Sequence, residues 1–234
     1  MSEKVSRNIN KYLVYISMSR ALFYLPIFVI FYNELGVPYS VVMLFFSVLS
    51  VVKFLLEVPS GSFADNVGRK KTLILSLMFK IVSLFLLVIL AFFVNKVNLL
   101  GYIAIIISTV FFGLGEVLES GTADALIYDY LKFCNEEDLY KDVTSKANSL
   151  VFFTFSISGI TGSIMYSVNR SIPYIVTLVA FVFSFISILS FNEINLSSKD
   201  KKSEKLVSST FATIIKSFKE LKSHKFLINI MLYG

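Results

Sequence analysis

Long apolar runs separated by short polar segments dominate the chain. Six of these runs reach about 20 residues, the length that a helix needs to cross the ~30 Å hydrocarbon core of a bilayer. They cover residues 12–32, 40–60, 72–94, 99–118, 147–168 and 172–191. None of them shows the period-two alternation that is typical of a membrane β-barrel. The pattern predicts an all-α membrane protein built from six transmembrane helices.

The composition supports the same class. Hydrophobic residues make up 56% of the 234 residues, and charged residues make up only 16%. Soluble domains carry nearer a quarter of charged residues, so a water-facing surface is not expected. The chain contains a single cysteine, which excludes a disulfide framework.

The positive charges are distributed unevenly between the loops. They gather before the first run, after the second, after the fourth and beyond the sixth, whereas the other loops hold only Lys96 and Arg170. Lysine and arginine collect in short cytoplasmic loops. The distribution predicts a multi-pass protein of the cell's inner (cytoplasmic) membrane, with the N-terminus and residues 192–224 in the cytoplasm. It also accounts for the net charge of +6 without a nucleic-acid partner.

The chain divides into three predicted parts. Residues 1–191 form the six-helix transmembrane bundle, and residues 192–224 form a cytoplasmic linker with a basic amphipathic helix. That helix lies in the membrane interface or packs on the same protein, and the pattern favours neither. Residues 225–234 resemble the start of a seventh span, although ten helical residues reach only about 15 Å. The expected molecule is the first half of a larger protein.

The segment GSFADNVGRKK, residues 61–71, directly follows the second run. It resembles the signature loop of the major facilitator superfamily, roughly G-x-L-A-D-R-x-G-R-K/R, and departs from it at Phe63 and Asn66. We call residues 61–71 the signature loop. The resemblance implies a six-helix N-terminal domain of two three-helix repeats (3+3), which is half of a twelve-helix transporter.

The residue types of the signature loop suit a conformational latch. Gly61 and Gly68 permit tight turns, and Asp65 accepts backbone N–H bonds or faces a helix N-terminus. Arg69 offers a planar fork for a carboxylate, and Lys70 adds positive charge. The alternative is a simple positive-inside anchor.

Two acids lie near the inner end of the fourth helix, Asp124 and Asp129. The resemblance implies that an acid at this helix end completes a charge relay with the signature loop. The sequence does not distinguish between the two, and both are also compatible with solvated surface acids.

Five ionisable residues fall inside the apolar runs and a sixth lies directly at the end of one, positions where charges are costly and usually functional. Arg20 lies about 14 Å into the first run, near the membrane centre. Five of the six are candidates for substrate binding or proton coupling: Arg20, Lys53, Glu57, Glu116 and Glu119. The remaining one, Lys80, is expected to be a structural or snorkelling lysine. Lys53 and Glu57 are four residues apart and are expected to pair on one helix face. Structural ion pairing is the competing interpretation of Arg20. Pro26 is expected to kink the first helix.

Two departures from the family pattern concern the proton-coupling arginine and the direction of transport. The fourth helix lacks the arginine that some members carry, and the fifth lacks the proline of the antiporter pattern G-P-x-x-G-G. Its segment SISGITGS instead contains the pairs Ser158/Gly162 and Gly159/Ser163, which allow helices to pack closely.

Together these features predict a secondary transporter that works by alternating access. Proton-coupled efflux of drug-like or other small solutes is the first hypothesis. The alternatives are a nutrient or sugar uptake permease and a truncated half that transports nothing. The expected partners are a small-molecule substrate, protons, the lipid bilayer and a C-terminal six-helix half. The sequence contains no Walker loop, zinc-ligand spacing or nucleophile motif, so neither an enzyme nor a cofactor or metal is expected.

Overall fold

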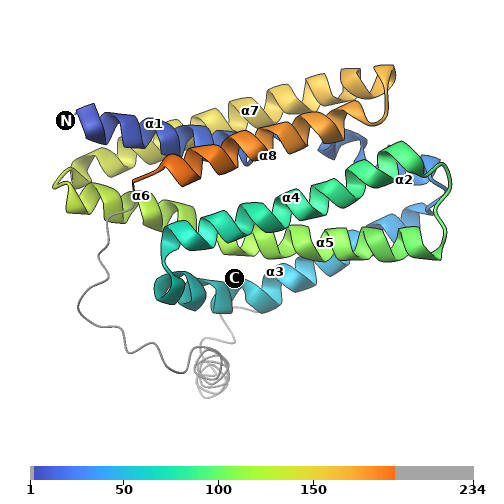
Figure 1. Cartoon of the computed structure of the whole chain (residues 1–234), viewed down its shortest axis with the longest axis horizontal. Coiled ribbons are helices and arrows are strands. Elements are labelled where there is room, and N and C mark those ends of the chain that lie inside the picture. The colour runs from blue at the N-terminus through green and yellow to red at the C-terminus, as the bar shows by residue number, and fades with distance from the viewer. Residues whose placement is uncertain (1–2, 193–234) are drawn as a thin grey trace, which may run out of the picture.

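The computed structural model describes residues 3–192, which form a bundle of helices without a strand in that range (Figure 1). The predicted linker with its amphipathic helix (beyond Asn192) and the predicted seventh span lie outside the described residues. The elements are α1 (Glu3–Met18), η1 (Leu25–Ile27), α2 (Phe28–Glu34), α3 (Tyr39–Val67), α4 (Arg69–Phe93), α5 (Leu99–Glu119), α6 (Thr122–Phe133), η2 (Glu137–Leu139), α7 (Tyr140–Val168) and α8 (Ile172–Ser190).

Within this range, five helical stretches are long and apolar enough to cross a membrane. They correspond to the second to sixth predicted spans, with α5 and α6 forming one of them. The structure thus confirms an all-α membrane domain. The prediction of one continuous first helix over residues 12–32 is wrong, because α1 ends at Met18 and the helix resumes only at Leu25.

Local chemistry explains why the first span is interrupted. Pro26 has no N–H to donate, and its ring clashes with the carbonyl of the residue four positions earlier. The side chains of Ser17 and Ser19 donate hydrogen bonds to backbone carbonyls of α1, which competes with regular helix. The backbone N–H of Phe23 donates instead to the Thr177 hydroxyl of α8, at 3.1 Å. The first span is therefore interrupted before Pro26 and is not a single helix bent at that residue.

The fourth span is interrupted as well. Between α5 and α6 lie Ser120 and Gly121, and Gly121 has φ +69°. A side chain at this left-handed position would strain the backbone, so glycine is required. Thus the first helix of each predicted three-helix repeat is broken.

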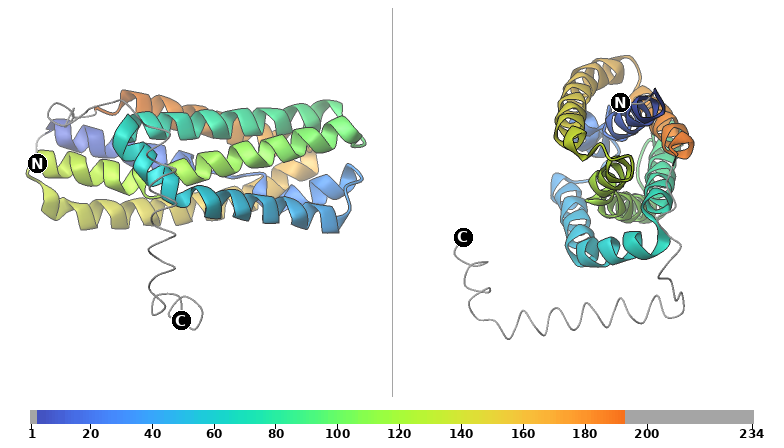
Figure 2. Two further views of the ribbon diagram at one scale, coloured as in Figure 1. Left: turned by 90° about the horizontal axis from the view of Figure 1, so that it is seen from below. Right: turned by 90° about the vertical axis from the view of Figure 1, so that its left-hand side faces the viewer.

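The helices pack in an exchanged order. α1 packs against α7 and α8, whereas α5 packs against α3 and α4. Figure 2 shows α5 lying between α3 and α4 along the bundle. The first helix of each three-helix repeat thus packs against the second and third helices of the other repeat. This is the 3+3 arrangement that the sequence predicted.

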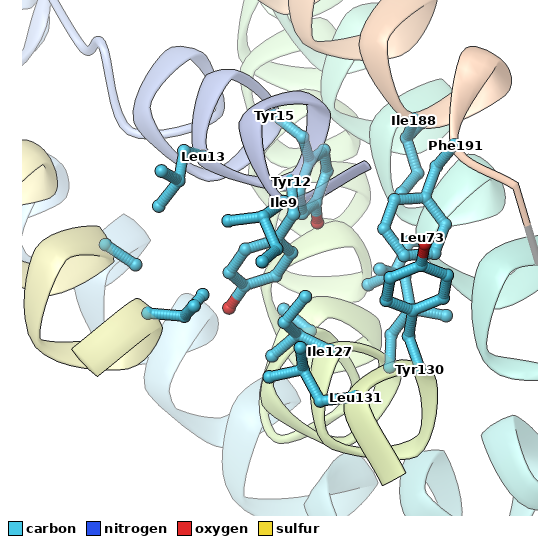
Figure 3. Close-up of a cluster of buried hydrophobic side chains, with 14 of the residues drawn as sticks. Ile9, Tyr12, Leu13, Tyr15, Leu73, Ile127, Tyr130, Leu131, Ile188 and Phe191 are labelled. Atoms are coloured by element: carbon cyan, nitrogen blue, oxygen red, sulfur yellow. The ribbon is translucent and has the colours of Figure 1, made fainter. Parts of the chain in front are cut away.

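Two hydrophobic clusters lie at opposite ends of the bundle. The first surrounds the end that carries Arg69, and Figure 3 shows Ile9 and Tyr12 of α1 beside Ile127 and Leu131 of α6. The second is rich in aromatic side chains and includes the stacked rings of Tyr24 and Tyr174. The charged side chains of the candidate site lie between the two clusters.

The signature loop is shorter than predicted. α3 remains helical through Val67, so the expectation of a turn at Gly61 is wrong. Only Gly68 turns the chain, with φ +105°, before α4 starts at Arg69. The helix continues past Pro59, and the end of α3 turns away from the axis of its first part (Figure 2), as expected for a helix bent at proline.

Candidate functional site

Arg69 joins the signature loop to α6. Its guanidinium lies 2.6 Å from the carboxylate of Asp129 and 3.6 Å from that of Asp65. It also donates to the carbonyl of Ala125, at 2.5 Å. The Asp129 side chain is 33% exposed and the Asp65 side chain 70% exposed, so the shorter contact with Asp129 is the stronger of the two ion pairs. Of the two acids that the sequence left open, Asp129 is the one in contact with Arg69.

Asp124 has a different partner. Its carboxylate accepts a hydrogen bond from the Tyr12 hydroxyl at 3.3 Å. The ammonium of Lys70 donates to the carbonyls of Leu189 and Phe191, at 2.9 and 2.8 Å. These carbonyls lie at the end of α8, where a lysine stabilises the helix C-terminus.

A second group of charges lies inside the bundle, and we call it the inner cluster. It consists of Arg20, Lys53, Lys80, Glu116 and Glu119. Glu116 is bound by Arg20 at 2.9 Å, by Lys80 at 2.6 Å and by Lys53 at 3.3 Å. Side chains from α3, α4 and the interrupted segment after α1 thus converge on one carboxylate of α5.

Glu119 occupies the most enclosed position of the inner cluster. It forms an ion pair with Lys80, and the Arg20 guanidinium lies 3.3 Å away. The hydroxyls of Tyr15 and Ser19 donate to it at 2.9 and 2.7 Å. The side chains of Lys80 and Glu119 are 0% and 1% exposed. Such buried charges persist only when every partner is in place.

The position of Lys80 excludes the snorkelling interpretation. Its ammonium is held by two carboxylates in the interior instead of reaching the interface. A side chain at Gly115 would place its Cβ 2.6 Å from the Lys80 side chain and 2.8 Å from the Ser76 carbonyl. Glycine at this position is therefore what lets α5 approach α4. This role of Gly115 was not predicted, although a glycine next to an intramembrane acid in the segment GLGE is a signal for close helix packing.

The expected pair of Lys53 and Glu57 does not form. Lys53 reaches across from α3 to Glu116 of α5, and Glu57 is exposed. The close approach of α3 and α5 at Gly113 favours this contact, because a Cβ there would lie 3.0 Å from Val52. Glu116 is largely buried and therefore attracts Lys53 more strongly than Glu57, which is exposed and lies one helical turn away.

The inner cluster lies where both interrupted helices break. Arg20 belongs to the break after α1, and Glu119 is the last residue of α5. In membrane transporters, discontinuous helices in corresponding positions of two repeats commonly form the substrate and ion site. Lys80 is 11 residues into α4, about 16 Å along a helix of 25 residues, which places the cluster near mid-membrane.

Comparison with known proteins agrees with this geometry. A sequence model described as Major Facilitator Superfamily matches residues 13–234. The chain belongs to the major facilitator superfamily. This is a superfamily of membrane transporters, so membership argues against an enzyme.

A curated member of the major facilitator superfamily is also similar to this chain. It is YxaM of Bacillus subtilis (strain 168), described as an uncharacterized MFS-type transporter. The identity is 24% over 210 residues, which cover 89% of this chain and 49% of YxaM. The chain thus spans about half the length of that relative. No solved structure matches the chain.

Proposed function

We propose that the protein is a secondary active transporter of small solutes that works by alternating access. The observation that carries the proposal is the inner cluster, a group of paired charges held near mid-membrane where two helices break. Ionisable groups at this depth are costly and mark solute or ion pathways. Membership of a superfamily of membrane transporters supports the same activity.

Proton-coupled efflux is the mode that we propose first. Glu116 is the proposed proton-exchanging acid, since its side chain is 12% exposed whereas that of Glu119 is 1% exposed. Uptake of a polar nutrient is the second candidate, because the charged residues of the inner cluster suit a solute that crosses the membrane in either direction. We place the signature loop on the cytoplasmic side of the cell's inner membrane. The lysines and arginines that gather at that end support this orientation.

The proposed latch is the contact of Arg69 with Asp129. Asp129→Asn removes the charge that Arg69 contacts at 2.6 Å. A hydrogen bond to a charged group is worth roughly 1.5–3 kcal/mol, so solute flux is expected to fall about tenfold or more while membrane insertion is unchanged. The readout is proton release from acid-loaded inverted vesicles on addition of solute, with the whole native protein.

Asp138→Asn is the matched control for that experiment. Asp138 is an exposed acid in η2 at the same end of the bundle, and its substitution is expected to leave flux unchanged. Equal flux in wild type and Asp129→Asn would contradict the latch. No solute-dependent proton movement in either direction, with correct insertion, would contradict proton-coupled transport and favour a chain that does not transport.

We further propose that the working transporter contains a second six-helix half. The greater length of YxaM supports this proposal. So does the low burial of α3 and α7, which pack least of the five spans. We expect the native protein, detected in its own membranes with an antibody against the N-terminus, to have about twice the mass of this 26.4 kDa chain. A product of 26.4 kDa would contradict the proposal and make the oligomeric state the next question.

A further inference from the structure

We propose that the inner cluster binds the carboxylate of an amphipathic organic monoanion, whose apolar body occupies a neighbouring aromatic pocket. This inference rests on the proposed transport function and specifies its substrate class. Three steps carry it: the charge balance of the cluster, the position of the pocket, and the depth of both in the membrane.

The inner cluster holds more positive than negative charge. Its cations are Arg20, Lys53 and Lys80, and its anions are Glu116 and Glu119, which leaves one positive charge in excess. The nearest further acid along α3, Glu57, is exposed, and no ion pair joins it to Arg20, Lys53 or Lys80. A charge in excess at this depth is costly, and a bound monoanion would neutralise it.

The excess charge is located at the accessible side of the cluster. Lys80 and Glu119 are enclosed together, whereas the side chains of Arg20 and Lys53 are 30% and 42% exposed. These two share Glu116 as a partner, at 2.9 and 3.3 Å. A solute carboxylate that approaches from the open side meets two cations and one carboxylate. Arg20 and Lys53 are therefore the residues assigned to bind it.

An apolar pocket adjoins the inner cluster. Its wall includes Tyr24, Phe28, Phe45, Leu49, Ser83 and Phe112. Leu49 is one helical turn from Lys53, and the ring of Phe112 lies 5.8 Å from the Lys80 ammonium. The hydroxyls of Ser83 and Ser108 already bond each other at 3.0 Å. The lining is mainly aromatic and aliphatic, which is the kind of wall against which the apolar body of the solute would lie.

Depth excludes a phospholipid head group as the source of the anion. The cluster lies about 16 Å along α4 from its first residue, whereas head groups remain at the membrane surface. A single excess charge also favours a monoanion over a dianion. A solute amine would add to the positive excess, so the same site is expected to reject cations.

The test compares three solutes with one apolar body: 4-phenylbutyrate, 4-phenylbutyramide and 4-phenylbutylamine. The whole native protein is purified in a neutral detergent, and the affinity of each solute is measured from its effect on the melting curve. We expect the carboxylate to bind at least tenfold more tightly than the amide and the amine to bind most weakly. Tighter binding of the amine, or no binding of the carboxylate, would overturn the inference.

Charge variants at Lys53 sharpen the test. Lys53→Gln leaves the cluster neutral, so the tenfold preference for the carboxylate over the amide is expected to disappear. Lys53→Glu leaves one negative charge in excess, and the amine is then expected to bind most tightly. Lys96→Gln, at an exposed lysine outside the cluster, is the control and should keep the wild-type order. An unchanged order in Lys53→Glu would also overturn the inference.

Failure of this inference is distinguishable from failure of the proposed function. The same three solutes are added to the inverted vesicles of the flux experiment. Proton movement beyond that in protein-free vesicles, seen with the amine or amide but not with the carboxylate, keeps transport and overturns anion selectivity. Proton movement with the carboxylate that is lost in Lys53→Glu supports both.

Discussion

Glu119→Gln is expected to lower the melting temperature of the protein by on the order of 10 °C. The substitution keeps the size of the side chain but removes its charge, so Lys80, 0% exposed, loses one of its two carboxylate partners. Arg20 loses its contact at 3.3 Å as well. Removing one partner from a buried ion pair costs about 3–5 kcal/mol, and each kcal/mol lowers the melting temperature of a domain this size by about 2–4 °C.

The matched control for this prediction is Glu57→Gln. It removes the same charge from an exposed position on α3, where substitution is expected to change stability by at most about 0.5 kcal/mol. The double variant Lys80→Met, Glu119→Leu removes both buried charges and should recover part of the loss. Thermal melting of the whole protein in detergent measures all three. A Glu119→Gln protein as stable as wild type would show that the ion pair contributes nothing to the fold.

Gly162→Ala is expected to destabilise the bundle and to disturb the break in the first span. A Cβ at Gly162 of α7 would lie 1.9 Å from the carbonyl oxygen of Phe23 and 2.8 Å from its carbonyl carbon. Backbone atoms of the interrupted segment cannot move aside as a flexible side chain can. Overpacking of this kind typically costs about 1–3 kcal/mol. We expect a lower melting temperature together with reduced flux, because Arg20 lies three residues before Phe23.

Gly159→Ala provides the contrast within the same helix. Apart from its chain neighbours and the backbone of α7, no atom of the described residues lies within 4 Å of a Cβ at Gly159. Alanine there should be neutral or stabilise α7 by up to about 1 kcal/mol. The two variants are compared by thermal melting and by flux in vesicles. Equal stability of both would mean that the segment around Phe23 is not held against α7 as the structure describes.

The sequence predicted the chemistry of the inner cluster better than its geometry. The apolar runs identified the spans, and the ionisable residues that the sequence singled out in them include every member of the inner cluster. Their pairing depends on the approach of helices that are distant in the sequence. Lys53 bonds to Glu116, 63 residues away, instead of to Glu57 one turn away. A local spacing rule does not include a partner on another helix.

The two helix breaks were harder to predict for a related reason. Residues 12–32 form one apolar run, and Pro26 predicted only a kink. What stabilises the break comes from the other repeat: Thr177 binds the free N–H of Phe23, and Gly162 leaves room for its carbonyl. Likewise, Arg69 contacts Asp129, whereas Asp124 accepts a hydrogen bond from Tyr12 of α1. These partners become visible only in the folded bundle.

The contact between Lys70 and the end of α8 joins two parts of the chain that are 119 residues apart. The chain therefore leaves the described bundle, after Asn192, from a point attached to the first turn of α4. Asn8 of α1 holds the same point to a second helix, since it exchanges two hydrogen bonds with Asn192 at 2.9 and 3.2 Å. If the signature loop moves as proposed, the exit point is pulled by Lys70 on one side and by Asn8 on the other. The position of α4 relative to α1 is then passed on to the chain that follows Asn192.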